Sequence, residues 1–471
     1  MTENKAVYQP TAIVIFGGTG NLAETKLLPS LFKLYTHQML PEAFKIIGLS
    51  RKDLSDVEYR KYVANSISKS VKDIEIEKLN TFCSHIVYAS GSFDDLNSYL
   101  RINDLLNQFD ETINQCTSKL FYLAVPPSLY AGIFANLKAS NAMALCDGVD
   151  SWSRLLVEKP FGQDLDTAQA LEKQLMSLFN ENQIYRIDHY LAKDSIENII
   201  SLRFANSILS DSWNGAQIED IKIKLFEDKD VSTRGAFYDG MGALRDVGQN
   251  HMLQMLALLT MSPVDVHSAE KMRQTRLEAL KSVVRLEDDI LIRAQYKGYQ
   301  DTVGVAPGSE TETYFKIGLH INNDLWKNLP VILESGKALK EAVAEAIITF
   351  KPTDLCYCHS DTDGHQHRNV LKITFSPEQR IELTMWIKEP GFGFKLHERK
   401  LVLNEYQGEE FRSPEAYERV LYDCIIGDQT RFVSGAEIEA AWGFITPILE
   451  EFRSTPLHKY NSGEEVYISE N

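Results

Sequence analysis

Cysteine is scarce in this chain, and long apolar runs are missing. Only six of the 471 residues are cysteine, far fewer than in the disulfide-rich scaffolds of secreted proteins. No apolar run has the length that a membrane-spanning helix needs, and the chain does not begin with the pattern of a secretory signal peptide. We therefore expect a protein of the cytoplasm that has no membrane partner.

Basic charge is in deficit. Lysine and arginine together number 49 against 66 aspartates and glutamates, which gives a formal net charge of -17. Nucleic acids and anionic membranes attract basic surfaces, so this balance argues against a nucleic-acid partner and against adsorption to such membranes. Any anionic ligand would need a local basic pocket.

The apolar content of 44% over 471 residues predicts a globular protein of two packed domains. In the first third, short apolar runs alternate with amphipathic stretches, which predicts an α/β, Rossmann-like, doubly wound domain with a parallel sheet. These runs are residues 11–17, 44–50, 85–90, 119–128 and 154–161. We expect this domain to span residues 1–185.

The remaining residues, 186–471, have a different texture. Five stretches with period-two alternation and few helices between them predict an α+β domain with one large antiparallel sheet. They are residues 218–227, 313–321, 345–352, 369–377 and 380–389. Two late helical stretches, residues 413–427 and 435–452, are expected to cover part of that sheet.

A glycine turn follows the first apolar run. In "IVIFGGTGNLAETKLLPSLFKLY", Gly18, Gly20 and Ala23 match the G-x-G-x-x-A spacing of dinucleotide-binding turns. Glycines let the backbone approach a pyrophosphate, and the helix that follows directs free N–H groups toward it. The alternative is an ordinary tight turn. The candidate cofactor-binding residues here are Gly17, Gly18, Thr19, Gly20, Asn21 and Leu22.

The second strand ends in Ser50 and Arg51, where an NAD-preferring site usually has an acidic residue. Arg51 favours a 2′-phosphate and therefore NADP. The alternative is a solvated arginine at the end of a strand, and Asp53 two residues later keeps NAD possible.

The stretch "RIDHYLAK", residues 186–193, is rich in functional side chains. His189, Tyr190 and Lys193 can converge on a phosphate or carboxylate. Lys193 would lie in the first turn of the next helix if that helix begins near residue 190 or 191, where the helix dipole also favours an anion. Asp188 suits a different task, since a carboxylate commonly orients a histidine or stabilises its protonated form.

That histidine can be His251, in the helical stretch "GALRDVGQNHMLQMLALL". Leu244, Val247, Met255 and Leu258 lie on the same side of this helix. A histidine of the apolar core is therefore the alternative.

Several motifs together carry a family resemblance over nearly the whole chain. "RIDHYLAK" resembles the signature R-I-D-H-Y-L-G-K of glucose-6-phosphate dehydrogenases, and "GGTGNLA" is similar to their G-A-S-G-D-L-A turn. The other matching segments are "EKPFGQDL", "RGAFYDGMGALRDVGQNHMLQ", "ESGKAL", "YERVLYDCIIGDQTRFV" and "EAAWGFITPIL". Their common order makes the resemblance far more specific than the glycine turn alone.

The resemblance implies a role for each matching residue. His251 would be the general base for the anomeric hydroxyl, Asp188 would orient it, and Lys159 would lie between substrate and cofactor, next to Pro160, whose peptide bond can be cis. The sugar phosphate would be bound by three residues of the signature, which are His189, Tyr190 and Lys193. The sugar hydroxyls would be bound by two acids and a lysine, which are Glu227, Asp246 and Lys337.

The activity implied by the resemblance is the oxidation of glucose 6-phosphate to 6-phosphoglucono-1,5-lactone with NADP, which is the entry step of the oxidative pentose phosphate pathway. The resemblance further implies a homodimer or homotetramer and no catalytic metal. The alternatives are an NAD(P)-dependent dehydrogenase of a related or modified pyranose, and a catalytically silent NADP-binding regulator.

The chain departs from the family pattern at several positions. Ala342 stands where a second basic residue is usual, with Lys340 as a possible substitute, and Ser376 stands where many relatives have a sugar-contacting glutamine. Asn21 replaces an aspartate and Ala192 a glycine, and the segment "DKDVSTRG" also differs. Specificity can therefore differ in the half of the site that binds the sugar hydroxyls.

One cluster lies outside the resemblance. The segment "CYCHSDTDGHQH", residues 356–367, contains ligand types that suit tetrahedral zinc. They are Cys356, Cys358, His359, His365 and His367. Because their spacing matches no standard zinc pattern, we expect a polar hairpin loop and no metal, with a zinc site as the alternative.

Overall fold

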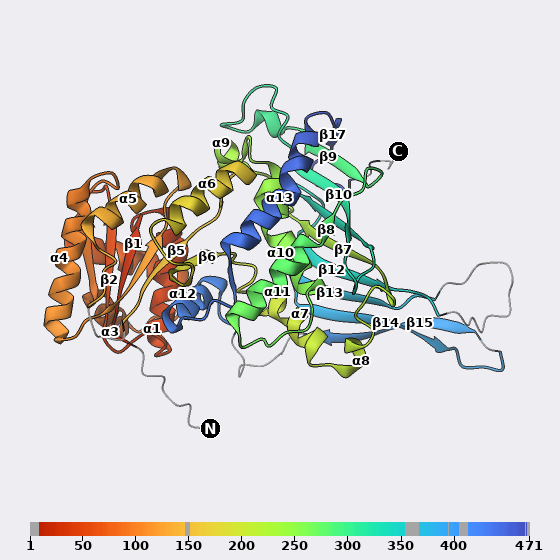
Figure 1. The fold of residues 1–471 in the computed structure, drawn as a ribbon, viewed down its shortest axis with the longest axis horizontal. Coiled ribbons are helices and arrows are strands. Elements are labelled where there is room, and N and C mark those ends of the chain that lie inside the picture. The colour runs from red at the N-terminus through yellow and green to blue at the C-terminus, as the bar shows by residue number, and fades with distance from the viewer. Residues whose placement is uncertain are drawn as a thin grey trace.

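The computed structural model describes residues 9–146, 151–353, 367–393, 395–404, 413–466 and 468. The chain forms an N-terminal α/β part and a C-terminal part in which helices pack on one large sheet (Figure 1). Within the described ranges, no helix is long and apolar enough to cross a membrane. Almost all of the cysteine and histidine segment 356–367 lies outside the described residues.

The N-terminal part is built on a seven-stranded sheet with the order β16-β6-β5-β4-β1-β2-β3. All its pairs are parallel except the pair of β16 with β6. Its strands are β1 (Thr11–Phe16), β2 (Phe44–Ser50), β3 (Ile86–Ser90), β4 (Ser118–Leu123), β5 (Ser153–Val157), β6 (Ile184–Ile187) and β16 (Phe432–Val433). The predicted doubly wound sheet is confirmed. The strand order reverses between β1 and β4, and open α/β sheets bind their ligands at the carboxyl ends of the strands at such a switch point.

Helices cover both faces of this sheet, which explains why all six residues of β1 are buried. They are η1 (Ala23–Leu27), α1 (Leu28–Thr36), α2 (Asp56–Ser70), α3 (Ile76–Ser84), α4 (Leu96–Ile113), η2 (Pro127–Leu129), α5 (Tyr130–Ser140), α6 (Leu165–Met176) and η3 (Glu181–Gln183). The predicted boundary after residue 185 falls inside β6, and the division of the domains stays a prediction.

The C-terminal sheet has ten strands, with the order β15-β14-β13-β12-β7-β11-β10-β9-β17 and β8 paired to β10. The strands are β7 (Ile218–Phe226), β8 (Val283–Val284), β9 (Leu291–Tyr296), β10 (Tyr314–Ile321), β11 (Leu329–Gly336), β12 (Val343–Phe350), β13 (Val370–Ser376), β14 (Arg380–Lys388), β15 (Leu396–Asn404) and β17 (Leu457–Tyr460). The sheet is mixed: β11 runs parallel to β7, and β17 runs parallel to β9. The two strands of each pair are far apart in the chain, with helices and other strands between them instead of a hairpin, which permits the parallel direction.

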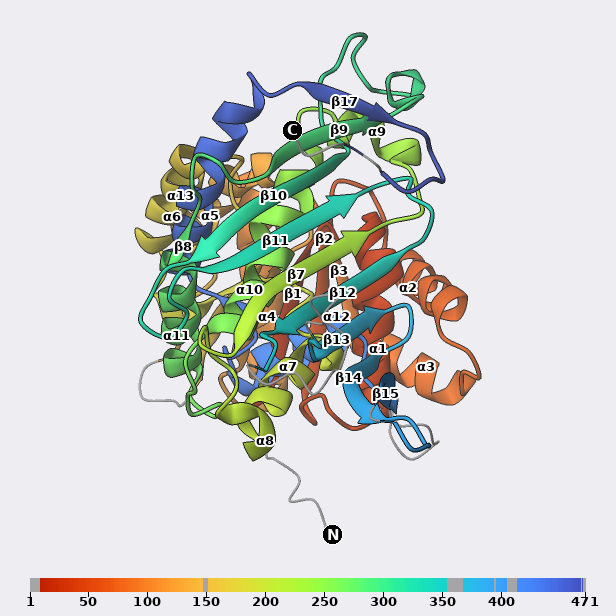
Figure 2. The ribbon, with the colours of Figure 1, turned by 90° about the vertical axis from the view of Figure 1, so that its right-hand side faces the viewer.

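Helices lie on one face of the large sheet, between it and the N-terminal part, whereas Figure 2 views the sheet from its other face. The helices that follow β6 in the chain are α7 (Asp194–Phe204), α8 (Ser207–Ser210), η4 (Ser232–Arg234), α9 (Gly235–Tyr238), η5 (Leu244–Met252), α10 (Leu253–Thr260), α11 (Ala269–Lys281), η6 (Tyr299–Asp301), α12 (Ala416–Ile426) and α13 (Gly435–Phe452). Helix α13 begins at a capping box, in which the Ser434 hydroxyl accepts a hydrogen bond from the Glu437 amide.

The predicted position of helix α12 is wrong. Its apolar face, which includes Val420, Leu421 and Ile425, packs against α1 in the core of the parallel sheet and not on the large sheet. Helix α13 packs against α6 and α11, so it connects the helix layers of both parts. An amphipathic pattern identifies the buried face of a helix but not the sheet that buries it.

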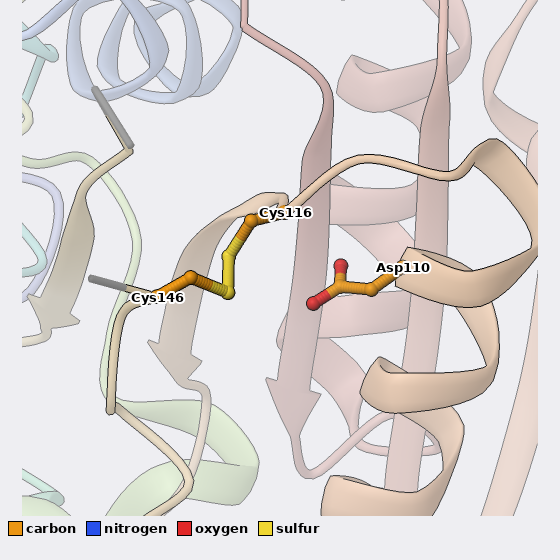
Figure 3. Close-up of side chains that lie close together, drawn as sticks. All are labelled: Asp110, Cys116 and Cys146. Atoms are coloured by element: carbon orange, nitrogen blue, oxygen red, sulfur yellow. A yellow bond between two sulfur atoms is a disulfide. The ribbon is translucent and has the colours of Figure 1, made fainter. Parts of the chain in front are cut away.

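A disulfide joins Cys116, just before β4, to Cys146, in the segment that leads to β5 (Figure 3). The Asp110 carboxylate lies beside it and accepts hydrogen bonds from the amide and hydroxyl of Thr117 at 3.0 and 2.6 Å. Since both sulfurs are bonded to each other, this group offers no thiolate to a metal ion. Disulfides persist mainly in oxidising compartments, so the cysteine count by itself does not support the cytoplasmic expectation.

Candidate active site

The glycine turn lies at the carboxyl end of β1, beside the carboxyl end of β4. Gly17 has a φ of +86°, and a Cβ atom there would lie 2.5 Å from the Ala124 carbonyl oxygen, so a side chain does not fit. The Gly20 amide donates to the Gly17 carbonyl at 2.8 Å, and a helical segment follows directly. A bare backbone turn before a helix N-terminus at the switch point fits the pyrophosphate of a dinucleotide.

Hydroxyl groups connect this turn to the end of β2. Thr19 Oγ1 lies 2.8 Å from Ser50 Oγ, which lies 2.7 Å from the Tyr88 hydroxyl. Arg51 follows with an exposed side chain, and Asp53 is exposed as well. The residues at the end of β2 that are expected to contact the 2′ position of a cofactor therefore lie next to the glycine turn. The exposed Arg51 side chain can reach a 2′-phosphate.

The structure brings Asp188 and His251 together although 63 residues separate them. Asp188 follows β6, and His251 lies on the π-helical segment η5, a distortion often found at functional sites. His251 Nδ1 lies 2.5 Å from Asp188 Oδ1, and both side chains are buried. A carboxylate only accepts, so Nδ1 carries the proton and donates, and Nε2 keeps its lone pair.

Lys159 faces that lone pair. It follows β5, its peptide bond to Pro160 is cis, and its Nζ lies 3.0 Å from His251 Nε2. The ammonium also donates to the Asp246 backbone carbonyl at 3.0 Å. Nε2 therefore points at a cation and not into an apolar core, which argues against the core-histidine interpretation.

The electrostatics favour a neutral base and an ionised carboxylate. Burial lowers the pKa of His251, the Asp188 charge opposes that effect, and the Lys159 charge adds to it, so the pKa lies below its ordinary value. Burial opposes the ionisation of Asp188, but attraction to His251 and the hydrogen bond between them outweigh it and hold the pKa of Asp188 well below its usual range. The imidazole is thus ready to accept a proton.

The other residues of the signature surround the imidazole. The Tyr190 ring stacks on His251 with centroids 4.3 Å apart, and the His189 ring meets it edge-on at 4.5 Å. Lys193 is the N-cap of α7, because the helix begins at Asp194, and its Nζ lies 3.7 Å from the centre of the Tyr190 ring. Burial lowers the pKa of Lys193. Burial and the charge of His251 lower the pKa of His189. An anion bound here would therefore stabilise the charged forms of both side chains.

The two acids and the lysine expected at the sugar hydroxyls also converge. Lys337 Nζ lies 2.6 Å from Glu227 Oε1 and 3.3 Å from Asp246 Oδ2. Asp246 Oδ1 is 3.6 Å from Lys159 Nζ, so this carboxylate joins the two lysines. Burial raises the pKa of Asp246, but the charges of both lysines outweigh burial and lower it. The result is a row of alternating charges that ends at the base.

One feature of the site was not predicted. Glu158 is half-buried beside Lys159, and Tyr122 on β4 donates to it at 2.5 Å. Burial raises the pKa of Glu158. The motif "EKPF" was the available signal, but only its lysine and proline were assigned a role.

Two of the residues at which the chain departs from the family pattern lie before β12. Ala342 is exposed there, and Lys340 pairs with Glu465 at 3.1 Å.

Comparison with known proteins gives a consistent result. The family model "Glucose-6-phosphate dehydrogenase, NAD binding domain" matches residues 14–198, and "Glucose-6-phosphate dehydrogenase, C-terminal domain" matches residues 200–466. A glucose-6-phosphate 1-dehydrogenase of Bacillus subtilis (strain 168) is 36% identical over 98% of this chain and 96% of its own length. A cytoplasmic glucose-6-phosphate 1-dehydrogenase 6 of Arabidopsis thaliana is 36% identical over 96% of this chain and 86% of its own length.

A solved structure is similar over its whole length. It is a glucose-6-phosphate dehydrogenase in complex with its substrate glucose 6-phosphate, with a TM-score of 0.88 and 32% identity. The match covers 98% of this chain and 96% of that one.

Proposed function

Because this chain belongs to the glucose-6-phosphate dehydrogenase family, we propose that its site oxidises glucose 6-phosphate to 6-phosphoglucono-1,5-lactone with NADP as the hydride acceptor. The reaction is the entry step of the oxidative pentose phosphate pathway. The observation that carries the proposal is the buried pair of His251 and Asp188, in which the imidazole Nε2 lies 3.0 Å from the Lys159 ammonium at the sugar half of the site.

His251 is the base in this reaction. The C1 hydroxyl of the sugar takes the place of the Lys159 ammonium at Nε2 and gives its proton to the imidazole. Asp188 holds the ring through Nδ1 and stabilises the imidazolium that forms. Lys159 stays within reach through its hydrogen bond to the Asp246 carbonyl, where its charge stabilises the developing alkoxide.

The phosphate group binds at the other end of the sugar. His189, Tyr190 and Lys193 would supply donors from one side. Burial lowers the pKa of Lys193, so an anion bound beside it would stabilise the charged ammonium. Glu227 and Asp246 accept hydrogen bonds from sugar hydroxyls, and Lys337 donates one. These contacts fix C1 beside His251.

The cofactor residues fit NADP. The pyrophosphate would be held by the backbone of the glycine turn, which comprises Gly17, Gly18, Thr19, Gly20, Asn21 and Leu22. Arg51 would bind the 2′-phosphate, whereas NAD has no 2′-phosphate for that guanidinium. When bound, the nicotinamide accepts the hydride from C1. Lys159 follows the carboxyl end of β5 and reaches the Asp246 carboxylate, and it would lie between the cofactor and the sugar.

A related pyranose is the second candidate. Ala342 removes a basic side chain at the sugar end, and Lys340 is held by Glu465 on the C-terminal segment. A dehydrogenase with fewer cations near the sugar would tolerate a modified or unphosphorylated ring.

The remaining expectations concern assembly and location. We propose a homodimer or homotetramer through the large sheet, because β14 and β15 expose apolar side chains that share one face in their register. They are Met385, Ile387, Leu401 and Leu403. We also propose a cytoplasmic location, as in the name of the Arabidopsis relative, with domains divided near residue 185 and no nucleic-acid or membrane partner.

Absorbance of the reduced nicotinamide tests the proposal. Purified protein is mixed with glucose 6-phosphate or glucose, each with NADP or NAD. We expect the highest kcat/KM for glucose 6-phosphate with NADP. A higher value for an unphosphorylated sugar would favour the second candidate, and no turnover with any pair would indicate the silent regulator.

A further inference from the structure

The C-terminal segment runs beside the turn that carries Lys337. Strand β17 lies along β9 at the edge of the large sheet (Figure 2), and the residues after it follow the turn 337–340 in order. The Tyr460 hydroxyl donates to the Lys337 carbonyl at 2.6 Å, and the Gly463 amide donates to the Ala338 carbonyl at 2.8 Å. Leu339 then pairs with Glu464, and Lys340 with Glu465.

Tyr460 is the buried member of this series. Its hydroxyl also lies 2.9 Å from Thr313 Oγ1, and Thr313 accepts the Lys337 amide through its own carbonyl at 2.9 Å. Both backbone polar groups of Lys337 are thus fixed by the pair Thr313 and Tyr460. The Tyr460 ring packs between Tyr296 and Tyr314, with centroid distances of 6.4 and 5.9 Å. The hydroxyl is therefore held in place from both sides.

The turn needs this support. Ala338 has a φ of +53°, which is a left-handed backbone conformation. This conformation is unfavourable in free energy for a residue with a Cβ atom, and it persists only where the surrounding contacts hold it. Its amide donates to the Lys229 carbonyl at 2.9 Å, so the turn is also tied to the loop after β7 that follows Glu227. A change of backbone direction here would move Lys337 Nζ away from Glu227 and Asp246.

We propose that Tyr460 is a positioning residue for the substrate-binding Lys337, acting through the Lys337 carbonyl. The inference rests on the proposed function, because it takes Lys337 as a donor to a sugar hydroxyl. The C-terminal strand then does more than complete the sheet, because the Tyr460 side chain, 123 residues from Lys337, fixes the direction of the lysine that contacts the sugar.

Tyr460→Phe removes the hydroxyl and keeps the ring. We expect KM for glucose 6-phosphate to rise by about threefold to tenfold, the effect of losing one buried hydrogen bond, with kcat and the KM for NADP nearly unchanged. Tyr296→Phe is the matched control, because it lies in the same tyrosine cluster but its hydroxyl accepts the Val231 amide, at 3.4 Å, and makes no hydrogen bond to Lys337. A purely structural role would lower the melting temperature and the active fraction of both variants and leave KM unchanged.

A double-mutant cycle with Lys337→Ala gives the second readout. If Tyr460 acts through Lys337, adding Tyr460→Phe to Lys337→Ala raises KM no further. Additive effects would overturn the inference, as would an unchanged KM in Tyr460→Phe. Thr313→Val removes the hydroxyl that holds Tyr460 and serves if Tyr460→Phe does not fold; a normal KM in that variant would also contradict the inference. Wild-type protein without activity on glucose 6-phosphate would instead refute the proposed function, and the inference with it.

Discussion

Replacement of Lys193 by methionine tests the phosphate half of the site. The lysine Nζ lies 3.7 Å from the centre of the Tyr190 ring, and that ring stacks on His251. Methionine keeps a flexible apolar chain over the ring, so the packing of the base is preserved while the charge is removed. The lost contact is a charge-assisted hydrogen bond to phosphate, worth about 1.5–3 kcal/mol, which corresponds to a rise in KM for glucose 6-phosphate of roughly ten- to hundredfold.

The assay compares glucose 6-phosphate with glucose. Because glucose has no phosphate, Lys193→Met should leave its kinetic constants nearly unchanged, and the preference for the phosphorylated sugar should fall by the same factor by which KM rises. Lys271→Met is the control, since it removes the same charge from an exposed position on α11. An equal loss for both sugars would refute the reasoning, because Lys193 would then support the shape of the site and not bind phosphate.

Three further predictions follow from the site and the fold. The pKa of His251 lies below the ordinary histidine value of about 6.5, so the base stays neutral down to a lower pH and the acid limb of kcat/KM should lie below about pH 6.5. Asp188 raises this pKa and Lys159 lowers it, so Asp188→Asn should move the acid limb to lower pH and Lys159→Met should move it to higher pH. A shift of the opposite sign in the pH profile of either variant, measured with the same sugar phosphate, would contradict the reasoning. Arg51→Ala should weaken NADP far more than NAD, because a guanidinium pairs bidentately with a 2′-phosphate, and an equal loss in titrations with both cofactors would reject this role. Reduction of the disulfide, which closes a loop of 30 residues, should lower the free energy of unfolding by about 3–4 kcal/mol on the chain-entropy model. The bond lies at the amino ends of β4 and β5, opposite the site, so kcat and KM should stay constant. A changed kcat in reduced, folded protein would contradict this expectation.

The parallel sheet was predictable because its strands are buried on both faces. Such strands appear as short apolar runs, and β1 to β5 all fall where these runs occur. The large sheet was predicted less completely. Strand β15 is exposed along nearly all of its length and β17 has only four residues, so neither has a clear apolar alternation. Their pairing depends on distant partners, which local periodicity does not identify.

The candidate site was predicted by residue chemistry and family resemblance together. Periodicity alone left His251 undecided between base and core residue, and the Lys159 ammonium at Nε2 favours the base, which stays a proposal. The support of Lys337 by Tyr460 had no signal in the sequence, because it requires the parallel pairing of β17 with β9. The position of α12 was wrong for a similar reason: its apolar face fits either sheet.

His251→Asn tests the central claim most directly. Asparagine is polar and smaller than histidine but does not accept a proton, so the variant should fold, bind glucose 6-phosphate and NADP with near-normal affinity in calorimetry, and lose roughly 10²–10⁴-fold in kcat. Melting temperature, binding and kcat are measured on the same sample. A folded variant that binds both ligands and keeps near-normal kcat would contradict the assignment of His251 as the base.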